Sequence, residues 1–286
     1  MKKFFVFGLI TLFAAFFVCG CASLETLSDA DITVAELEEK MEKAMDPEGA
    51  FKKASSYVQR EMFKIEGIFF DTIYQNDLKY KKPHYLRLLT LENNQPLSAL
   101  IYNSGSAWTV DYNEKKVTEI TGSDLIKFNM LQQLTTPDKK YSQLFKKVDI
   151  FKCTLRDDPT VYYKLVCKPQ NEKNTISIYV DAKDFLPRHI KAELSFIFEG
   201  KEVHLDYDCT INAYELMDDV MIPREVTCIS NDIVTTTTVF DYKLNVNIPD
   251  SEFLPPVFVE KKLQNRMDRF AKDNPRRGLR RSNLND

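Results

Sequence analysis

Hydrophobic positions change their spacing once in the first third of the chain. Val34, Leu37, Met41 and Met45 recur at helical spacing, and Thr33-Val-Ala-Glu36 has the sequence of a capping box, so a helix is predicted here. Asp46-Pro47 starts a second helical piece, because proline is tolerated in the first turn of a helix. From about residue 57 the spacing falls to two, which indicates β-strands.

Two series of alternating runs predict antiparallel strands with a helical insertion between them. The insertion begins at Ser123-Asp124, is broken by Pro137, and is followed by a further helix in "KYSQLFKKV". Its apolar stripe consists of Leu125, Phe128, Leu131 and Leu134. The later strands alternate clearly: Val203, Leu205, Tyr207, Cys209 and Ile211 are separated by polar residues. We therefore predict an α+β, mainly antiparallel β fold with about ten or eleven strands.

A sheet of that size should curl into a barrel or half-barrel with one apolar face. The helical pieces can cover only part of this concave face, which leaves an apolar pocket. The candidate cavity and lid residues are the stripe on the insertion together with Phe69, Trp108, Phe196, Phe198, Tyr207 and Phe240. The alternative is that the strands close and side chains fill the interior, leaving no room for a ligand.

The N-terminus predicts export. Lys2 and Lys3 precede the apolar run from Phe4 to Val18, which is too short for a comfortable membrane span and is typical of a secretory signal peptide. Val18-Cys19-Gly20-Cys21 resembles the lipobox of bacterial lipoproteins, in which a small residue precedes the lipid-modified cysteine. Gly20 meets that requirement for Cys21, whereas Cys19 would follow the larger Val18. An ordinary signal with incidental cysteines is the alternative.

These observations divide the chain into four parts. Residues 1–20 form the signal, 21–31 a lipidated tether, 32–258 a single domain, and 259–286 a basic tail. Ala22 and Ser23 after the cysteine favour the outer membrane over the inner one, with the domain facing the periplasm.

Four other cysteines remain, namely Cys153, Cys167, Cys209 and Cys228. Within each consecutive pair the cysteines flank a predicted turn almost symmetrically, as bonded neighbours in a hairpin would. All four also lie on the apolar side of their strands, where free cysteine behaves as a small buried hydrophobe. Both readings stay open.

Composition excludes several classes of function. The formal charge is −3, and removal of Lys2 and Lys3 makes it −5, which does not suit nucleic acid as a main partner. The chain has only 8 Gly and no phosphate-binding glycine motif. It has 3 His and no C-x-x-C, so neither a metal site nor a cofactor is predicted. The sequence has no nucleophile or metalloprotease motif. Asp157-Asp158 and Asp218-Asp219 are interpreted as turn residues. We therefore predict that the protein is not an enzyme.

The tail has a different composition. Residues 260–286 hold nine Lys or Arg against four acidic residues, and "NPRRGLRRSN" has no apolar period. One interpretation of the tail is a solvated segment. The more specific hypothesis is that it contacts anionic lipid headgroups.

The order of elements resembles the LolA/LolB-like family of periplasmic lipoprotein and lipid carriers. The similarity covers roughly residues 34–256 and rests on four segments in the right order: "KKPHYLRL", "NSGSAWTVDYNEKKV", "IYVDAKDFLPRHIKAEL" and "DVMIPREVTC" followed by "DYKLNVNIPDSEFLPP". The resemblance implies an unclosed barrel that shields acyl chains. It also implies a gating or headgroup role for Lys82 and Arg87, although Lys82 stands where the soluble carriers have arginine.

The sequence therefore predicts an envelope lipoprotein that binds the acyl chains of a lipoprotein or lipid, and that receives cargo from a periplasmic carrier. The alternative is a protein–protein interaction or regulatory module with a filled barrel.

Overall fold

A single antiparallel sheet of 14 strands organises the described part of the chain. The computed structural model describes residues 25–67, 70–122, 125, 140–156, 158–169, 175–198, 201–230 and 233–258. The strands are β1 (Glu25–Asp29), β2 (Ser56–Gly67), β3 (Phe70–Lys81), β4 (Tyr85–Glu92), β5 (Gln95–Asn103), β6 (Ser106–Asp111), β7 (Lys116–Ile120), β8 (Lys147–Leu155), β9 (Asp158–Lys168), β10 (Thr175–Asp181), β11 (Pro187–Phe198), β12 (Lys201–Met217), β13 (Val220–Ser230) and β14 (Ile233–Leu244). The helical elements are α1 (Val34–Met45), α2 (Ala50–Lys53), α4 (Tyr141–Leu144) and the 3₁₀ turn η1 (Asp250–Phe253).

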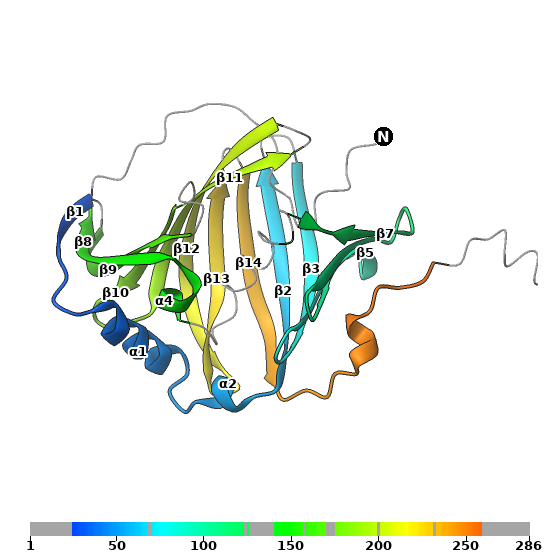
Figure 1. Cartoon of the computed structure of the whole chain (residues 1–286), viewed down its shortest axis with the longest axis horizontal. Helices are drawn as coiled ribbons and strands as arrows, with labels where there is room; N and C mark the ends of the chain where they lie inside the picture. Colours follow the sequence, from blue (N-terminus) through cyan, green and yellow to red (C-terminus); the bar gives the residue numbers. More distant parts are fainter. Residues whose placement is uncertain are drawn as a thin grey trace, which may run out of the picture.

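Two meanders lie side by side in this sheet. The order is β1-β8-β9-β10-β11-β12-β13-β14-β2-β3-β4-β5-β6-β7, so the first meander, β2–β7, joins the second, β8–β14, through the pairing of β14 with β2. Figure 1 shows the strands fanning from β1 on the left to β7 on the right, with a change of direction typical of sheet twist. Because β1 and β7 are both edges, the sheet is open.

The antiparallel β prediction is confirmed, but the strongly curved half-barrel is not. The sheet is neither closed nor strongly curled, and it has 14 strands rather than ten or eleven. The count was low partly because the apolar alternation in "EMFKIEGIFFDTIY", residues 61–74, predicts a single strand. They belong to two strands, β2 and β3, which pair as a hairpin. An apolar run that crosses a turn without glycine or proline pairs carries no signal for the turn.

The predicted capping box of α1 is present. The backbone N–H of Glu36 donates to Thr33 Oγ1 at 3.2 Å, and the Glu36 carboxylate accepts from the backbone N–H of Thr33 at 2.7 Å. The second helical piece is shorter than expected, because α2 ends at Lys53 and β2 begins at Ser56. The helix predicted in "KYSQLFKKV" is only the single turn α4.

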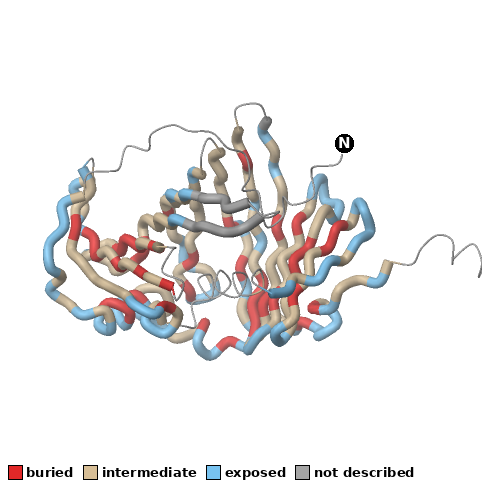
Figure 2. Tube along the Cα trace, turned by 45° about the horizontal axis from the view of Figure 1, so that its top comes forward, coloured by how far each residue is buried: buried red, intermediate tan, exposed pale blue. Residues whose placement is uncertain are grey.

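Helices cover one face of the sheet at two places, and we call this the helix face. At one end, α1 and α4 pack on β9 and β10 in a core of Leu37, Met41, Phe145, Tyr163, Leu165, Cys167, Ile176, Ile178 and Val180. Toward the other end, Phe51 of α2 packs in a core of Tyr57, Tyr80, Leu86, Leu100, Ala107, Val220, Ile222, Val239 and Tyr242. Figure 2 shows buried segments on the left and at the lower right, in agreement with these two cores.

The C-terminal segment covers part of the opposite face, which we call the back face. Phe253 is fully buried against Val58 and Ile248. Glu252 accepts from Lys79 Nζ at 3.0 Å and from the Arg87 guanidinium. Residues 246–258 therefore form part of the folded domain.

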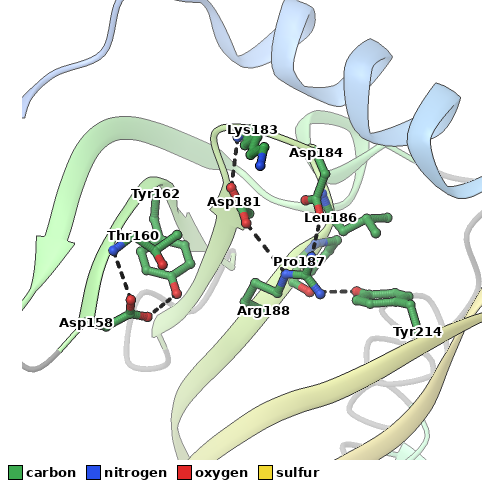
Figure 3. Close-up of polar contacts among 10 residues, drawn as sticks. All are labelled: Asp158, Thr160, Tyr162, Asp181, Lys183, Asp184, Leu186, Pro187, Arg188 and Tyr214. Carbon is green, nitrogen blue, oxygen red and sulfur yellow. Dashed lines mark hydrogen bonds and ion pairs between the residues drawn. The ribbon is translucent and has the colours of Figure 1, made fainter.

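Polar contacts hold the turn between β10 and β11. Asp181 accepts from the backbone N–H of Lys183 at 2.8 Å, and Asp184 accepts from that of Leu186 at 3.0 Å. The Arg188 guanidinium contacts both carboxylates, as Figure 3 shows. These contacts fix the start of β11.

Truncation of a core residue tests the importance of the core under α1 and α4. Leu165 is fully buried, so Leu165→Ala should lower the free energy of unfolding by about 2–5 kcal/mol. Leu216 is 57% exposed, and Leu216→Ala is the control, with an expected change of less than about 0.5 kcal/mol. Urea titration followed by circular dichroism measures both; equal losses would contradict the assignment of this core.

Candidate ligand-binding face

Rows of side chains cross the helix face between the two cores. Strand register aligns Ile190, Cys209, Cys228, Thr235 and Ile65 in one row. The next row contains Ile211, Val226, Thr237, Phe63 and Tyr74. Most of these side chains are partly buried, and apolar groups predominate. The middle of the helix face therefore presents a mainly apolar surface that spans both meanders.

A polar row borders this surface. Register aligns Glu61, Asn76, Thr90, Ser98 and Asp111 across β2–β6. Thr90 Oγ1 donates to Asn76 Oδ1 at 3.0 Å, and Asn76 Nδ2 donates to Glu61 Oε1 at 2.9 Å. Three adjacent strands are thus linked by one chain of hydrogen bonds.

Both carboxyl groups in the polar row are perturbed by burial. Desolvation raises the pKa of Glu61, and hydrogen bonds from Asn76 and Gln59 only partly offset this effect. Desolvation also raises the pKa of Asp111, whose side chain is 1% exposed. Asp111 Oδ1 accepts from the backbone N–H of Glu114 at 2.7 Å, while its Oδ2 has no hydrogen-bond partner among the described residues. Burial of these two carboxyl groups is only partly offset and costs stability, and perturbed carboxyl groups are frequent at functional sites.

The four cysteines divide into one bonded pair and two free thiols. Cys209 and Cys228 face each other in β12 and β13 and form a disulfide, with an S–S distance of 2.16 Å. Cys153 and Cys167 are free and buried, so of the two readings left open, the buried free thiol holds for this pair. Their symmetry about the turn is misleading, because Cys153 pairs with Tyr162 and Cys167 with Val148.

Two predicted cavity residues lie on the helix face. Leu125 packs against the core under α2, and Tyr207 lies beside the disulfide row, where burial raises the pKa of its hydroxyl.

Two other predicted cavity residues are not on this face. Trp108 packs on the back face beside Ile101, Val110 and Phe258. Phe240 is 44% exposed, because the register between β14 and β2 shifts between Val239 and Asp241. This β-bulge puts both Val239 and Tyr242 into the core and leaves Phe240 outside it.

The predicted gating residues have structural partners instead. Lys82 Nζ donates to the carbonyl oxygens of Phe51 and Lys52 at the end of α2, at 3.0 and 3.1 Å. Arg87 lies on the back face and pairs with Glu252. Neither side chain takes part in the apolar surface of the helix face.

Several predictions fall outside the described residues. These are the lipidation site Cys21, the cavity residues Phe69, Phe128, Leu131 and Leu134, and the tail 259–286; the side chains of Phe196 and Phe198 are likewise not described. The predicted tether, 21–31, overlaps the structure, and residues 25–29 of it form β1, paired with β8.

No helix of the described part of the chain is long and apolar enough to cross a membrane. Among those same residues, no three His, Cys, Asp or Glu side chains are grouped so that they could hold a metal ion.

Comparison with known proteins identifies the fold. No family model and no curated protein sequence matches the chain. A DUF1329 family protein from Desulfovibrio piger matches with a TM-score of 0.55 at 11% identity, covering 79% of this chain and 98% of that one. A LolA superfamily protein from Nitrosomonas europaea matches with a TM-score of 0.52 at 13% identity, covering 78% and 98%. The chain therefore has the fold of the LolA superfamily, and the resemblance drawn from its sequence is confirmed at that level.

Sequence reasoning missed the polar row. Its members lie on five strands, and only the register between those strands brings them together. The one available signal was Glu61 at an apolar position in the alternation Tyr57, Gln59, Glu61, Phe63, Ile65, which marks a carboxyl on a buried face.

Thiol chemistry checks the assignment of the cysteines. Burial raises the pKa of Cys153 to about 11 and that of Cys167 to about 12, so neither thiol should react in the folded protein. For the chain from residue 21 with Cys21→Ser, Ellman's reagent should detect two thiols after unfolding without reductant, and four with it. A rapidly reacting thiol in the native protein would contradict the burial.

The raised pKa of Glu61 predicts a pH dependence. The folded state holds this proton more tightly than the unfolded state, so the contribution to stability is complete below the ordinary pKa of 4.5 and is lost as the pH rises through the folded value. Glu61→Gln should remove this loss and stabilise the protein at neutral pH. Urea midpoints between about pH 4 and pH 8 measure the effect. Glu66→Gln, on the back face of the same strand, should keep the wild-type profile.

Proposed function

We propose that the protein is a lipid-anchored envelope lipoprotein that binds acyl chains on the helix face, as a carrier or receiver of lipoprotein or lipid. The observation that supports this best is the mainly apolar surface between the two cores, on a fold shared with the LolA superfamily. A fold alone does not assign a function, so the argument depends on what the surface can bind.

Acyl chains suit this surface for physical reasons. The rows from Ile190 to Ile65 and from Ile211 to Tyr74 offer dispersion contacts across several strands, and each CH₂ removed from water contributes about 0.8 kcal/mol. The polar row lies next to them and offers hydrogen-bonding side chains to the polar end of a cargo molecule. The polar end of the cargo would then lie along the row and the chains across the apolar surface.

Anchoring at Cys21 makes a receiver more suitable than a free shuttle. Two or more acyl chains hold a protein stably at a membrane, whereas one chain binds only marginally. A fixed acceptor needs a soluble carrier to deliver the cargo, so a periplasmic carrier is the implied partner. The role requires binding and release alone, so no catalytic activity is proposed.

An interaction module with a filled interior is the second candidate. Ile65, in the middle of the helix face, is only 1% exposed, which favours side chains filling this space. In that case the face would contain no ligand, and a partner protein would bind elsewhere.

Lipid extraction separates the two candidates. The chain from residue 21 with Cys21→Ser cannot be lipidated, so any acyl species that copurifies is cargo. Native mass spectrometry should detect bound lipid if the protein is a carrier. A protein free of lipid, unable to take up a fluorescent fatty acid, would favour the interaction module.

Two adjacent threonines provide a matched test of the binding face. Thr237 points to the helix face between Val226 and Phe63, and Thr238 points to the back face beside Met62. Thr237→Trp should fill the binding surface and weaken fatty-acid uptake by about tenfold, a loss of about 1.4 kcal/mol. The Thr238→Trp variant should take up fatty acid as well as the protein without this substitution does. Equal uptake by the two variants would contradict acyl binding on the helix face.

A further inference from the structure

A hollow on the back face lies at the end of the sheet nearest the N-terminus of the described chain. It has a volume of about 310 Å³ and belongs to strands β8 to β13. Its lining is Leu155, Arg156, Asp158, His189, Lys191, Asp208, Thr210, Thr227 and Ile229. The hollow is separate from the apolar surface proposed for acyl chains, which occupies the helix face.

The lining carries balanced charge. Arg156 and Lys191 oppose Asp158 and Asp208, and Lys191 Nζ lies 3.2 Å from Asp208 Oδ2. Arg156 is exposed, and within the described ranges no carboxylate forms an ion pair with it. Exposure places its guanidinium where it can meet an anion from solution.

The protonation states keep this balance near neutral pH. Hydrogen bonds from Thr160 and Tyr162 lower the pKa of Asp158, so this carboxylate stays ionised; Figure 3 shows both contacts. Burial lowers the pKa of His189, so its ring stays neutral, and its Nδ1 lies 3.2 Å from Thr210 Oγ1. Among the described lining residues, two positive and two negative side chains face the hollow.

The start of β1 lies beside this hollow. Glu25 pairs in register with Leu155, a lining residue, and its carboxylate is 2.6 Å from Lys164 Nζ. Burial acts to raise the pKa of Glu25, but hydrogen bonds from Lys164 and Tyr179 outweigh this effect, and the pKa is lowered overall. Glu25 therefore stays an ionised partner that fixes β1 in place. The edge strand is thus bound to the body of the sheet.

The length of the connecting chain sets the distance to the membrane. Three residues separate Cys21 from Glu25, so their Cα atoms are at most about 14 Å apart. The headgroup layer of one leaflet is itself about 5–8 Å thick. If Cys21 bears acyl chains, the β1 edge of the sheet, with the hollow beside it, lies close to the headgroups.

From these observations we infer that the hollow binds the headgroup of a zwitterionic membrane phospholipid with a primary ammonium group. This inference rests on the proposed anchoring at Cys21. The phosphate would accept from Arg156, whose planar guanidinium matches phosphate oxygens, and the ammonium group would donate to Asp158 or Asp208. Leu155 and Ile229, the latter 49% exposed, would contact the start of the acyl chains. The bound headgroup orients the domain, with the helix face directed away from the anchoring leaflet.

Headgroup compounds without acyl chains test the inference independently of acyl binding on the helix face. The chain from residue 21 with Cys21→Ser is titrated with glycerophosphoethanolamine, glycerol 3-phosphate and inorganic phosphate, and binding is followed by the NMR signals of His189. We expect glycerophosphoethanolamine to bind at least about tenfold more tightly than the two phosphates.

Two variants identify the groups involved. Arg156→Gln should weaken the binding of glycerophosphoethanolamine by about tenfold. Asp208→Asn should also weaken the binding of this compound but leave the binding of glycerol 3-phosphate undiminished. Lys147→Gln, at the other end of β8, is the control and should bind as the parent does. In sedimentation, vesicles rich in phosphatidylethanolamine should retain more protein than phosphatidylcholine vesicles.

Three results would overturn the inference. Equal binding of all three compounds would indicate a simple anion site. Undiminished binding of glycerophosphoethanolamine by the Arg156→Gln variant would indicate that it binds elsewhere. No response at His189 would show that the hollow takes no headgroup. Loss of fatty-acid uptake in Thr237→Trp with headgroup binding intact would show that the two sites are independent.

Discussion

The pairing of β14 with β2 makes two meanders into one sheet. It runs from Val234 opposite Glu66 to Leu244 opposite Tyr57, and all rows that cross both halves of the helix face pass through it. Without this contact each meander would expose the backbone groups of a long edge strand. The core under α2 also requires the pairing, because Tyr57 comes from the first meander and Tyr242 from the second. The apolar surface therefore exists only after strands far apart in sequence have met.

This dependence explains how far the sequence could predict the structure. Local patterns identified α1, whose capping box needs only Thr33 and Glu36, and identified the alternation of most strands. They could not show that β1 joins the edge of the sheet, since "ETLSD" is short and polar and pairs with residues more than a hundred positions later. The strand order of the sheet was not predicted, because it depends on pairings between residues far apart in the sequence.

The candidate site was less predictable than the fold. A period of two assigns side chains to faces only while the register is regular, and the bulge at Phe240 exchanges the faces within one strand. Trp108 was assigned to the cavity because it is large and apolar, yet the C-terminal segment gives it a partner on the back face. The role predicted for Arg87 had the same weakness, because its ion-pair partner Glu252 lies far along the chain. Long-range partners decide such positions.

The carboxyl groups on the two faces of the sheet have different surroundings, and this difference favours separate roles for the two faces. On the helix face, burial raises the pKa of the Glu61 and Asp111 carboxyl groups. On the back face near β1, Glu25 has Lys164 as its partner, and Asp158 has Tyr162. A mainly apolar surface suits acyl chains, whereas ionised groups of both signs suit a zwitterion at the membrane surface. If Cys21 is lipidated, as proposed, the short connection keeps the β1 edge and the charged hollow close to the headgroups, and a headgroup bound in the hollow would leave cargo on the helix face accessible from the aqueous side.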